Sequence, residues 1–386
     1  MKKYLFLSFK KKIPLFVIIA VTFLVIAFVS SSTIDFVARI NKEGYYFYRD
    51  RDTGFIGLMI ALFITTTFLP FFNMNYRYSL SRSDTFRQAA FKERHIRYGE
   101  HLVTLITALL AFTLAFIVLV VGLRINNATT YLPPEDTYFK YELITFEYVW
   151  YIPLYFAAVI LSVLEYFVCY FFISRSNNFL NSLITLVMGQ GFLTCIINIP
   201  SIFFTTVYLV FNHTGSTASI FFPISYLYAQ FNPLIYCGEN DIADLFTFSS
   251  KDVTIGAIQF IAASTLFLGL SGLGIYAFLK EKDPSSEWAN KPGSNKIHQE
   301  IIFHAGFFAM GALIACGLAQ GSSIVWLILF YSLFGATYYT MYGLLNRNFK
   351  LKLRETFTLV GVVLAILAVS IAYAVVVSIN TPQYTL

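Results

Sequence analysis

The sequence predicts an all-α membrane protein: a polytopic bundle of about nine transmembrane helices with its N-terminus inside. Composition leads to this class, because 57% of the 386 residues are hydrophobic and 12% are charged. A soluble domain has about 25% charged residues. The charges are also unevenly placed, and long stretches contain none. This pattern excludes both a soluble enzyme and a disordered chain.

Nine apolar runs have the length needed to cross the hydrocarbon core, which takes about 20 helical residues. They are 13–30, 55–72, 102–123, 147–173, 182–209, 253–279, 301–319, 324–344 and 356–378. Of the 48 charged residues only Glu147 and Glu165 fall within these runs. A charge at the bilayer centre costs several kcal/mol, which explains the exclusion.

The distribution of Lys and Arg predicts the orientation. The segments expected inside hold 20 of these basic residues and the segments expected outside hold 7. Because cytoplasmic loops are enriched in Lys and Arg, we expect a cytoplasmic N-terminus and an external C-terminus. The first run is expected to remain as a helix rather than be cleaved as a signal peptide. The net charge of +6 reflects topology, and no nucleic-acid partner is expected.

Residues 1–12 form a short amphipathic segment with aromatic residues between its basic ends. We expect segment 1–12 to be a cytoplasmic anchor that binds membrane lipids through anionic headgroups. The chain has no P-loop, no H-E-x-x-H, no paired C-x-x-C and no G-x-S-x-G. We therefore expect no metal, cofactor or nucleotide bound by this chain and no enzymatic activity of its own.

Segment 73–101 is the longest basic segment predicted to be cytoplasmic. Ser81 or Ser83 is a suitable N-cap for a short helix whose first turn carries Asp84. Phe86 lies on the apolar face of that helix. Two interpretations are open: a loop along the lipid headgroups, or a docking helix for a cytoplasmic partner.

The run 78–86, followed by a helix into the next span, resembles the ABC-2 type transporter permeases. The match is partial, since Ser79–Arg82 stand where that family often has a proline. Ser286, Glu287 and Ala289 resemble a run after the sixth span in a subset of Firmicute ABC permeases. Residues 343–351 are similar to the same subset's basic turn before the last span. The resemblance implies ATPase coupling by Ser81, Arg82, Ser83, Asp84, Thr85, Phe86 and Arg87.

The resemblance also implies a domain order and a function. A six-span permease domain, 13–279, would be followed by a cytoplasmic linker, 280–300, and three additional spans in 301–386. The chain would be the permease subunit of an ATP-driven exporter in a bacterial plasma membrane, with ATP on a separate ABC ATPase subunit. It would pair as a homodimer or with a similar permease. The cargo would be an amphiphile such as a peptide, a lipid or a drug.

Segment 210–252 is apolar and aromatic, but Pro223 and Pro233 break it before it reaches a spanning length. Tyr226 and Tyr228 suit the outer membrane interface. In the family a re-entrant hairpin stands here, so the resemblance implies an outer gate formed by these four residues. The alternative is an interfacial loop with no gating role.

Three polar residues inside the predicted spans are candidates for the translocation path: Glu165, Gln190 and Asn198. An intramembrane acid faces the interior of a bundle. The sequence is equally compatible with a structural role for Glu165 and with a role in contacting the cargo. Gln190 and Asn198 fit better as hydrogen-bond partners between helices than as ligands.

Two other function classes are open. An ion-coupled secondary transporter would need ionisable groups at the bilayer midplane, and only Glu165 approaches that requirement. A membrane-embedded transferase acting on a lipid substrate would need catalytic groups in long outer loops. The pairs Glu135–Asp136 and Asp241–Asp244 are its candidates, although both fit solvated acidic loops better.

Overall fold

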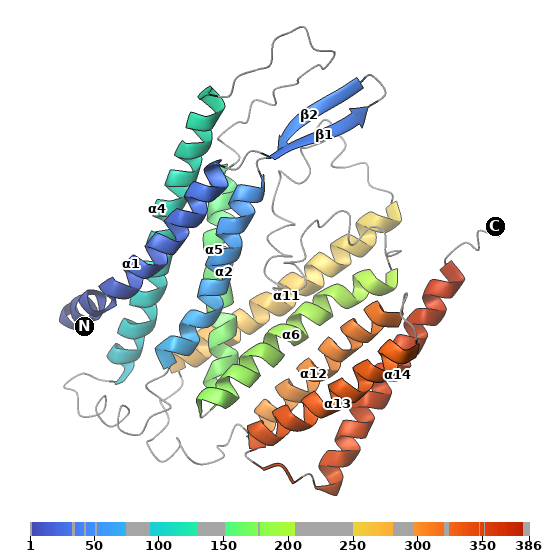
Figure 1. Ribbon diagram of the computed structural model, residues 1–386. Helices are drawn as coiled ribbons and strands as arrows, with labels where there is room; N and C mark the ends of the chain where they lie inside the picture. The colour runs from blue at the N-terminus through green and yellow to red at the C-terminus, as the bar shows by residue number, and fades with distance from the viewer. Residues whose placement is uncertain are drawn as a thin grey trace. The chain divides into compact units, whose positions relative to one another are not determined.

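The computed structural model describes residues 2–32, 35–41, 44–50, 52–74, 93–129, 151–176, 178–204, 250–280, 296–319, 324–346, 348–350 and 352–380. This part of the chain contains nine helices and one pair of strands (Figure 1). The helices are α1 (Lys2–Ser32), α2 (Asp52–Asn73), α4 (Glu93–Thr129), α5 (Tyr151–Ser174), α6 (Phe179–Phe204), α11 (Ser250–Lys280), α12 (Lys296–Ala319), α13 (Ile324–Asn346) and α14 (Leu353–Asn380). Each predicted apolar run overlaps one of them.

Four helical stretches in the described residues are long and apolar enough to cross a membrane. They are Lys12–Ser31 in α1, Tyr98–Leu123 in α4, Leu154–Ser174 in α5 and Leu353–Val375 in α14. Shorter apolar stretches lie in α2, α6 and α11. The fold is therefore that of a mainly helical membrane protein, while the nine spans and the orientation stay predictions.

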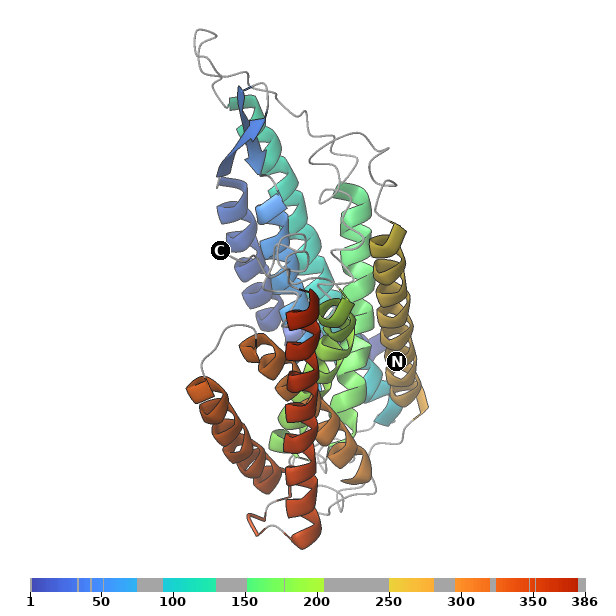
Figure 2. The same cartoon turned by 90° about the vertical axis from the view of Figure 1, so that its right-hand side faces the viewer.

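The all-α prediction has one exception in the described residues. β1 (Asp35–Asn41) and β2 (Gly44–Asp50) form an antiparallel pair that runs from Asp35 opposite Asp50 to Asn41 opposite Gly44. The pair connects the C-terminal end of α1 to the N-terminal end of α2 (Figure 2). Aromatic and β-branched residues favour strands, and 45–48 reads Tyr-Tyr-Phe-Tyr. Both strands lie within the predicted outer segment 31–54, where the pattern of apolar runs gives no signal of them.

The first compact unit comprises Met1–Leu69, Ala89–Glu165 and Phe231–Asp241. Its main contact is between α1 and α4, which lie side by side (Figure 1). Phe23 of α1 and Phe112 of α4 meet edge to face with their ring centroids 6.5 Å apart. A Cβ at Gly122 would lie 2.7 Å from the side chain of Ser31, so glycine permits this close approach. The predicted anchor and the first apolar run form one continuous helix, α1.

The second compact unit comprises Pro70–Gln88, Tyr166–Gln230 and Ile242–Leu386. Within it α12 packs along α6 and also contacts α13 and α14. A Cβ at Gly306 of α12 would overlap with the backbone carbonyl of Met188 in α6, so these two backbones are in close contact. The buried core around this contact consists of Ile184, Met188, Phe303, Phe307, Ala315, Phe334, Tyr338, Tyr342, Leu345 and Ile366.

Candidate functional site

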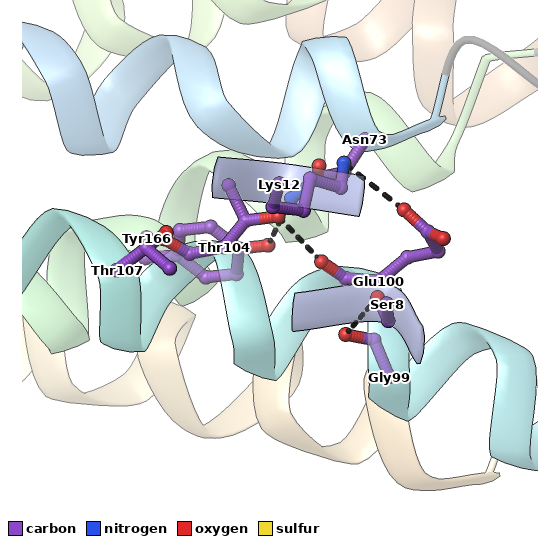
Figure 3. A network of polar contacts seen from close by, with 8 residues as sticks. All are labelled: Ser8, Lys12, Asn73, Gly99, Glu100, Thr104, Thr107 and Tyr166. Carbon is purple, nitrogen blue, oxygen red and sulfur yellow. Dashed lines mark hydrogen bonds and ion pairs between the residues drawn. The ribbon is translucent and has the colours of Figure 1, made fainter. Parts of the chain in front are cut away.

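One polar contact joins the N-terminal part of α1 to the first part of α4. The amine Nζ of Lys12 lies 3.0 Å from the carboxylate Oε2 of Glu100 (Figure 3). The side chain of Lys12 is 18% exposed and that of Glu100 is 9% exposed. This ion pair is therefore largely shielded from solvent, and each charge depends on the other for much of its stabilisation.

A second contact lies one helical turn before Lys12. The hydroxyl of Ser8 donates a hydrogen bond to the carbonyl oxygen of Gly99 at 3.3 Å (Figure 3). Ser8 and Lys12 are four residues apart and so share one face of α1. This face contacts consecutive residues of α4, Gly99 and Glu100. We call this set of four residues the α1–α4 junction.

A buried polar stripe continues along α4 beyond the junction. The hydroxyl of Thr104 donates to the carbonyl of Glu100 at 2.6 Å, and that of Thr107 donates to the carbonyl of Thr104 at 2.7 Å (Figure 3). His101 is also buried. Because both threonine hydroxyls bond within their own helix, the stripe is compatible with an apolar environment.

Glu165 is fully buried in α5, as expected for an acid inside a bundle. Its carboxylate Oε1 accepts a hydrogen bond from the hydroxyl of Thr67 in α2 at 3.1 Å. Thr67 lies 98 positions earlier in the chain, and the sequence carried no signal of this pairing. The contact defines a buried acid with a hydroxyl donor between two apolar helices of the first unit.

Gln190 in α6 is buried, and its amide Nε2 donates to the Sγ of Cys169 in α5 at 3.1 Å. It therefore contacts a neighbouring helix, as proposed for an interhelical partner. Asn198 also lies in α6, but its side chain is outside the described residues. Also in the second unit, the amide Nδ2 of Asn73 donates to the hydroxyl of Tyr166 at 3.2 Å (Figure 3).

An amide network at one end of the second unit was not predicted. The amide Nδ2 of Asn181 donates to the carbonyl of Leu345 at 3.1 Å and to Oε1 of Gln299 at 3.5 Å. The Nε2 of Gln299 donates to the carbonyl of Arg175. The network brings together the α5–α6 turn, the start of α12 and the end of α13. All three places lie within or next to segments for which the distribution of Lys and Arg predicts a cytoplasmic location.

All of the individual residues predicted for ATPase coupling and for the outer gate lie outside the described part of the chain. This holds for Ser81, Arg82, Ser83, Asp84, Thr85, Phe86, Arg87, Pro223, Tyr226, Tyr228 and Pro233. The acidic pairs of the transferase alternative, Glu135–Asp136 and Asp241–Asp244, also lie outside it. No group of three or more His, Cys, Asp or Glu side chains suitable for a metal ion occurs among the described residues.

Comparison of the chain with family models, curated proteins and solved structures gives no match. The case for a function therefore rests on the residues and contacts given above.

Proposed function

We propose that the chain is the permease subunit of an ATP-driven exporter of the ABC-2 type. It would move an amphiphilic cargo (a peptide, lipid or drug) across a bacterial plasma membrane. A separate ATPase subunit would bind and hydrolyse ATP, because this sequence has no P-loop. Two membrane subunits, identical or similar, would enclose the path.

The observation that supports this proposal best is the α1–α4 junction. A motor docked on segment 73–101 must pass its movement to helices in the membrane. α4 begins within that segment, at Glu93, and continues through the stretch Tyr98–Leu123 as one helix of 37 residues. At 1.5 Å per residue such a helix is about 55 Å long. A displacement at its start is thereby carried into the span, and the junction would take α1 along with it.

The experiment is co-purification of the full chain with soluble ATPases from its own host. We expect a P-loop protein to bind, and Arg82→Glu to weaken that binding at least tenfold. Arg49→Glu is the matched control, because Arg49 carries the same charge in a segment predicted to lie outside. If Arg82, Asp84 and Phe86 can all be replaced while binding persists, segment 73–101 is not the docking site.

The nine spans and the inside N-terminus are part of the same proposal. The amide network supports them, because it gathers the turn at Arg175, the start of α12 and the end of α13 at one end of the second unit. In a bundle whose spans alternate in direction, these three helix ends would lie on the same side of the membrane. Reporter fusions test the orientation. Green fluorescent protein should be fluorescent at the N-terminus, and alkaline phosphatase should be active after Asn380. The reverse pattern would invert the topology.

Glu165 favours one alternative, an ion-coupled secondary transporter. A fully buried carboxyl that accepts a bond from Thr67 has the chemistry of a proton or sodium site. The two functions differ in their energy source. Proteoliposomes with a proton or sodium gradient and no ATPase should show no uptake or export if the first proposal is correct. Gradient-driven transport that Glu165→Gln abolishes would establish the alternative.

A further inference from the structure

The turn between α13 and α14 alternates apolar and basic residues, reading Phe-Lys-Leu-Lys-Leu-Arg from 349 to 354. Lys350, Lys352 and Arg354 are all exposed. Phe349 and Leu353 beside them are 51% and 75% exposed. This surface therefore places the charged groups of two lysines and one arginine directly next to exposed apolar side chains.

Hydrogen bonds hold the α13 side of this turn in place. The backbone N–H of Asn348 donates to the carbonyl of Gly343 at 3.0 Å, and its side-chain Oδ1 accepts from the N–H of Lys350 at 2.9 Å. The hydroxyl of Tyr339 donates to the carbonyl of Phe349 at 2.5 Å. The Phe349 ring lies over Gly343, where any Cβ would overlap with it. These contacts fix the backbone at residues 348–350, from which the side chain of Lys350 extends.

The α14 side is held by a helix cap. The N–H of Lys352 donates to the carboxylate Oε2 of Glu355 at 2.7 Å, and its carbonyl accepts from the N–H groups of Glu355 and Thr356. The bond from the Lys352 N–H to the Glu355 side chain is the half of a capping box that the Glu at the third helical position supplies. The Glu355 carboxylate that accepts this bond keeps its negative charge and offsets one of the three basic residues. Between 348 and 355 the formal charge is +2.

The helix that follows the turn presents a long apolar face that the described residues leave exposed. The stretch Leu353–Val375 of α14 has membrane length, and only 17% of it is buried. The exposed apolar side chains along it are Leu353, Phe357, Val360, Leu364, Leu367, Ile371 and Val375. Side chains of this kind at hydrocarbon depth are covered by lipid acyl chains. The three basic residues lie at the N-terminal end of this apolar stretch, where a spanning helix would meet the lipid headgroups.

We propose that the α13–α14 turn is a binding site for an anionic phospholipid. Lys350, Lys352 and Arg354 would bind the phosphate and any second negative group of the lipid head. Phe349 and Leu353 would contact the upper part of its acyl chains. The proposal is independent of the transport function, because it uses only the turn and the exposed face of α14.

Native mass spectrometry of the purified full chain tests this site, with phosphatidylglycerol and phosphatidylcholine titrated separately. We expect tighter binding of phosphatidylglycerol, and a loss of affinity of about fivefold for each of Lys350→Gln and Lys352→Gln, at about 1 kcal/mol per basic residue. Phosphatidylcholine binding should not change. The charge-conserving pair Lys350→Arg and Lys352→Arg should retain the phosphatidylglycerol affinity, which separates loss of charge from loss of fold.

Lys280→Gln is the matched control, because Lys280 is an exposed lysine at the end of another apolar helix, α11. It should change phosphatidylglycerol affinity less than twofold. An equal effect of Lys280→Gln would mean diffuse charge attraction and would overturn the site. Competition by inorganic phosphate at the same concentration as the lipid would also overturn it, in favour of a simple anion site. Disulfide cross-linking in membranes between two copies that carry Val360→Cys would also overturn the lipid site, because a second copy would then cover α14.

Discussion

The ion pair between Lys12 and Glu100 is the contact whose removal should have the clearest consequence. At the observed 3.0 Å, two unit charges attract each other by about 5.5 kcal/mol in a medium of effective dielectric constant about 20. Loss of hydration offsets much of this, because the two side chains are only 18% and 9% exposed. Exposed pairs contribute about 0.2–1 kcal/mol. For this shielded pair we expect a coupling free energy of about 1–3 kcal/mol.

A double-mutant cycle measures that coupling directly. The variants are Lys12→Gln, Glu100→Gln and the combination, and the free energy of unfolding is measured in detergent for each. Lys12→Gln should be the more damaging single change, because it leaves a carboxylate in a poorly hydrated place. The combination should cost less than the two single losses together. Lys10→Gln is the control: Lys10 is exposed, and its replacement should change stability by less than about 0.5 kcal/mol.

Two results would refute this reasoning. Additivity of the single losses to within about 0.5 kcal/mol would show that the two charges do not stabilise each other. The functional arm uses the combined variant in proteoliposomes with its ATPase. If the α1–α4 junction transmits movement, the ATPase should still bind while cargo transport falls. Unchanged transport would show that the junction is only structural.

Three further changes have definite expected outcomes. Gly306→Ala should lower the free energy of unfolding by about 1–3 kcal/mol, because its Cβ would overlap with the Met188 carbonyl; Gly335→Ala, with open space around it, should be near neutral. Asn181→Ala removes two hydrogen bonds and should cost about 1 kcal/mol, seen as a lower Tm; an unchanged Tm would mean that water replaces the amide. Glu165→Gln keeps a hydrogen-bond acceptor and nearly the same volume, so the free energy of unfolding and ATP-driven transport should both be unchanged. A loss of transport at unchanged stability would assign the carboxyl a functional role.

The residues of the candidate site show which parts could be predicted. The position of Glu165 alone predicts a buried acid, since it interrupts a long apolar run. Its donor Thr67 was not identified, because hydroxyl residues are common in apolar helices and their partners depend on how two helices are rotated. Lys12 belongs to segment 1–12, whose role as a lipid anchor stays a prediction. The structure adds an ion pair between Lys12 and Glu100, 88 positions later in the chain, of which the sequence gives no signal.

The sequence by itself determined the class of protein and the positions of its helices. The predicted run 324–344 corresponds to α13 at Ile324–Asn346, and the other eight runs also overlap helices. The prediction of helix positions succeeds because placing a charge or an unpaired backbone group in hydrocarbon costs free energy within each segment. That cost does not depend on which other helix the segment packs against.

Only the tertiary structure decided which surfaces meet. The Lys12–Glu100 pair, the Asn181 network and the contact at Gly306 all depend on the register and rotation of one helix against another. Within a membrane the apolar side chains of a helix are as well solvated by lipid as by protein, so hydrophobicity does not select the partner face. That choice rests on small residues and a few polar groups, whose effect appears only when two segments distant in sequence come together.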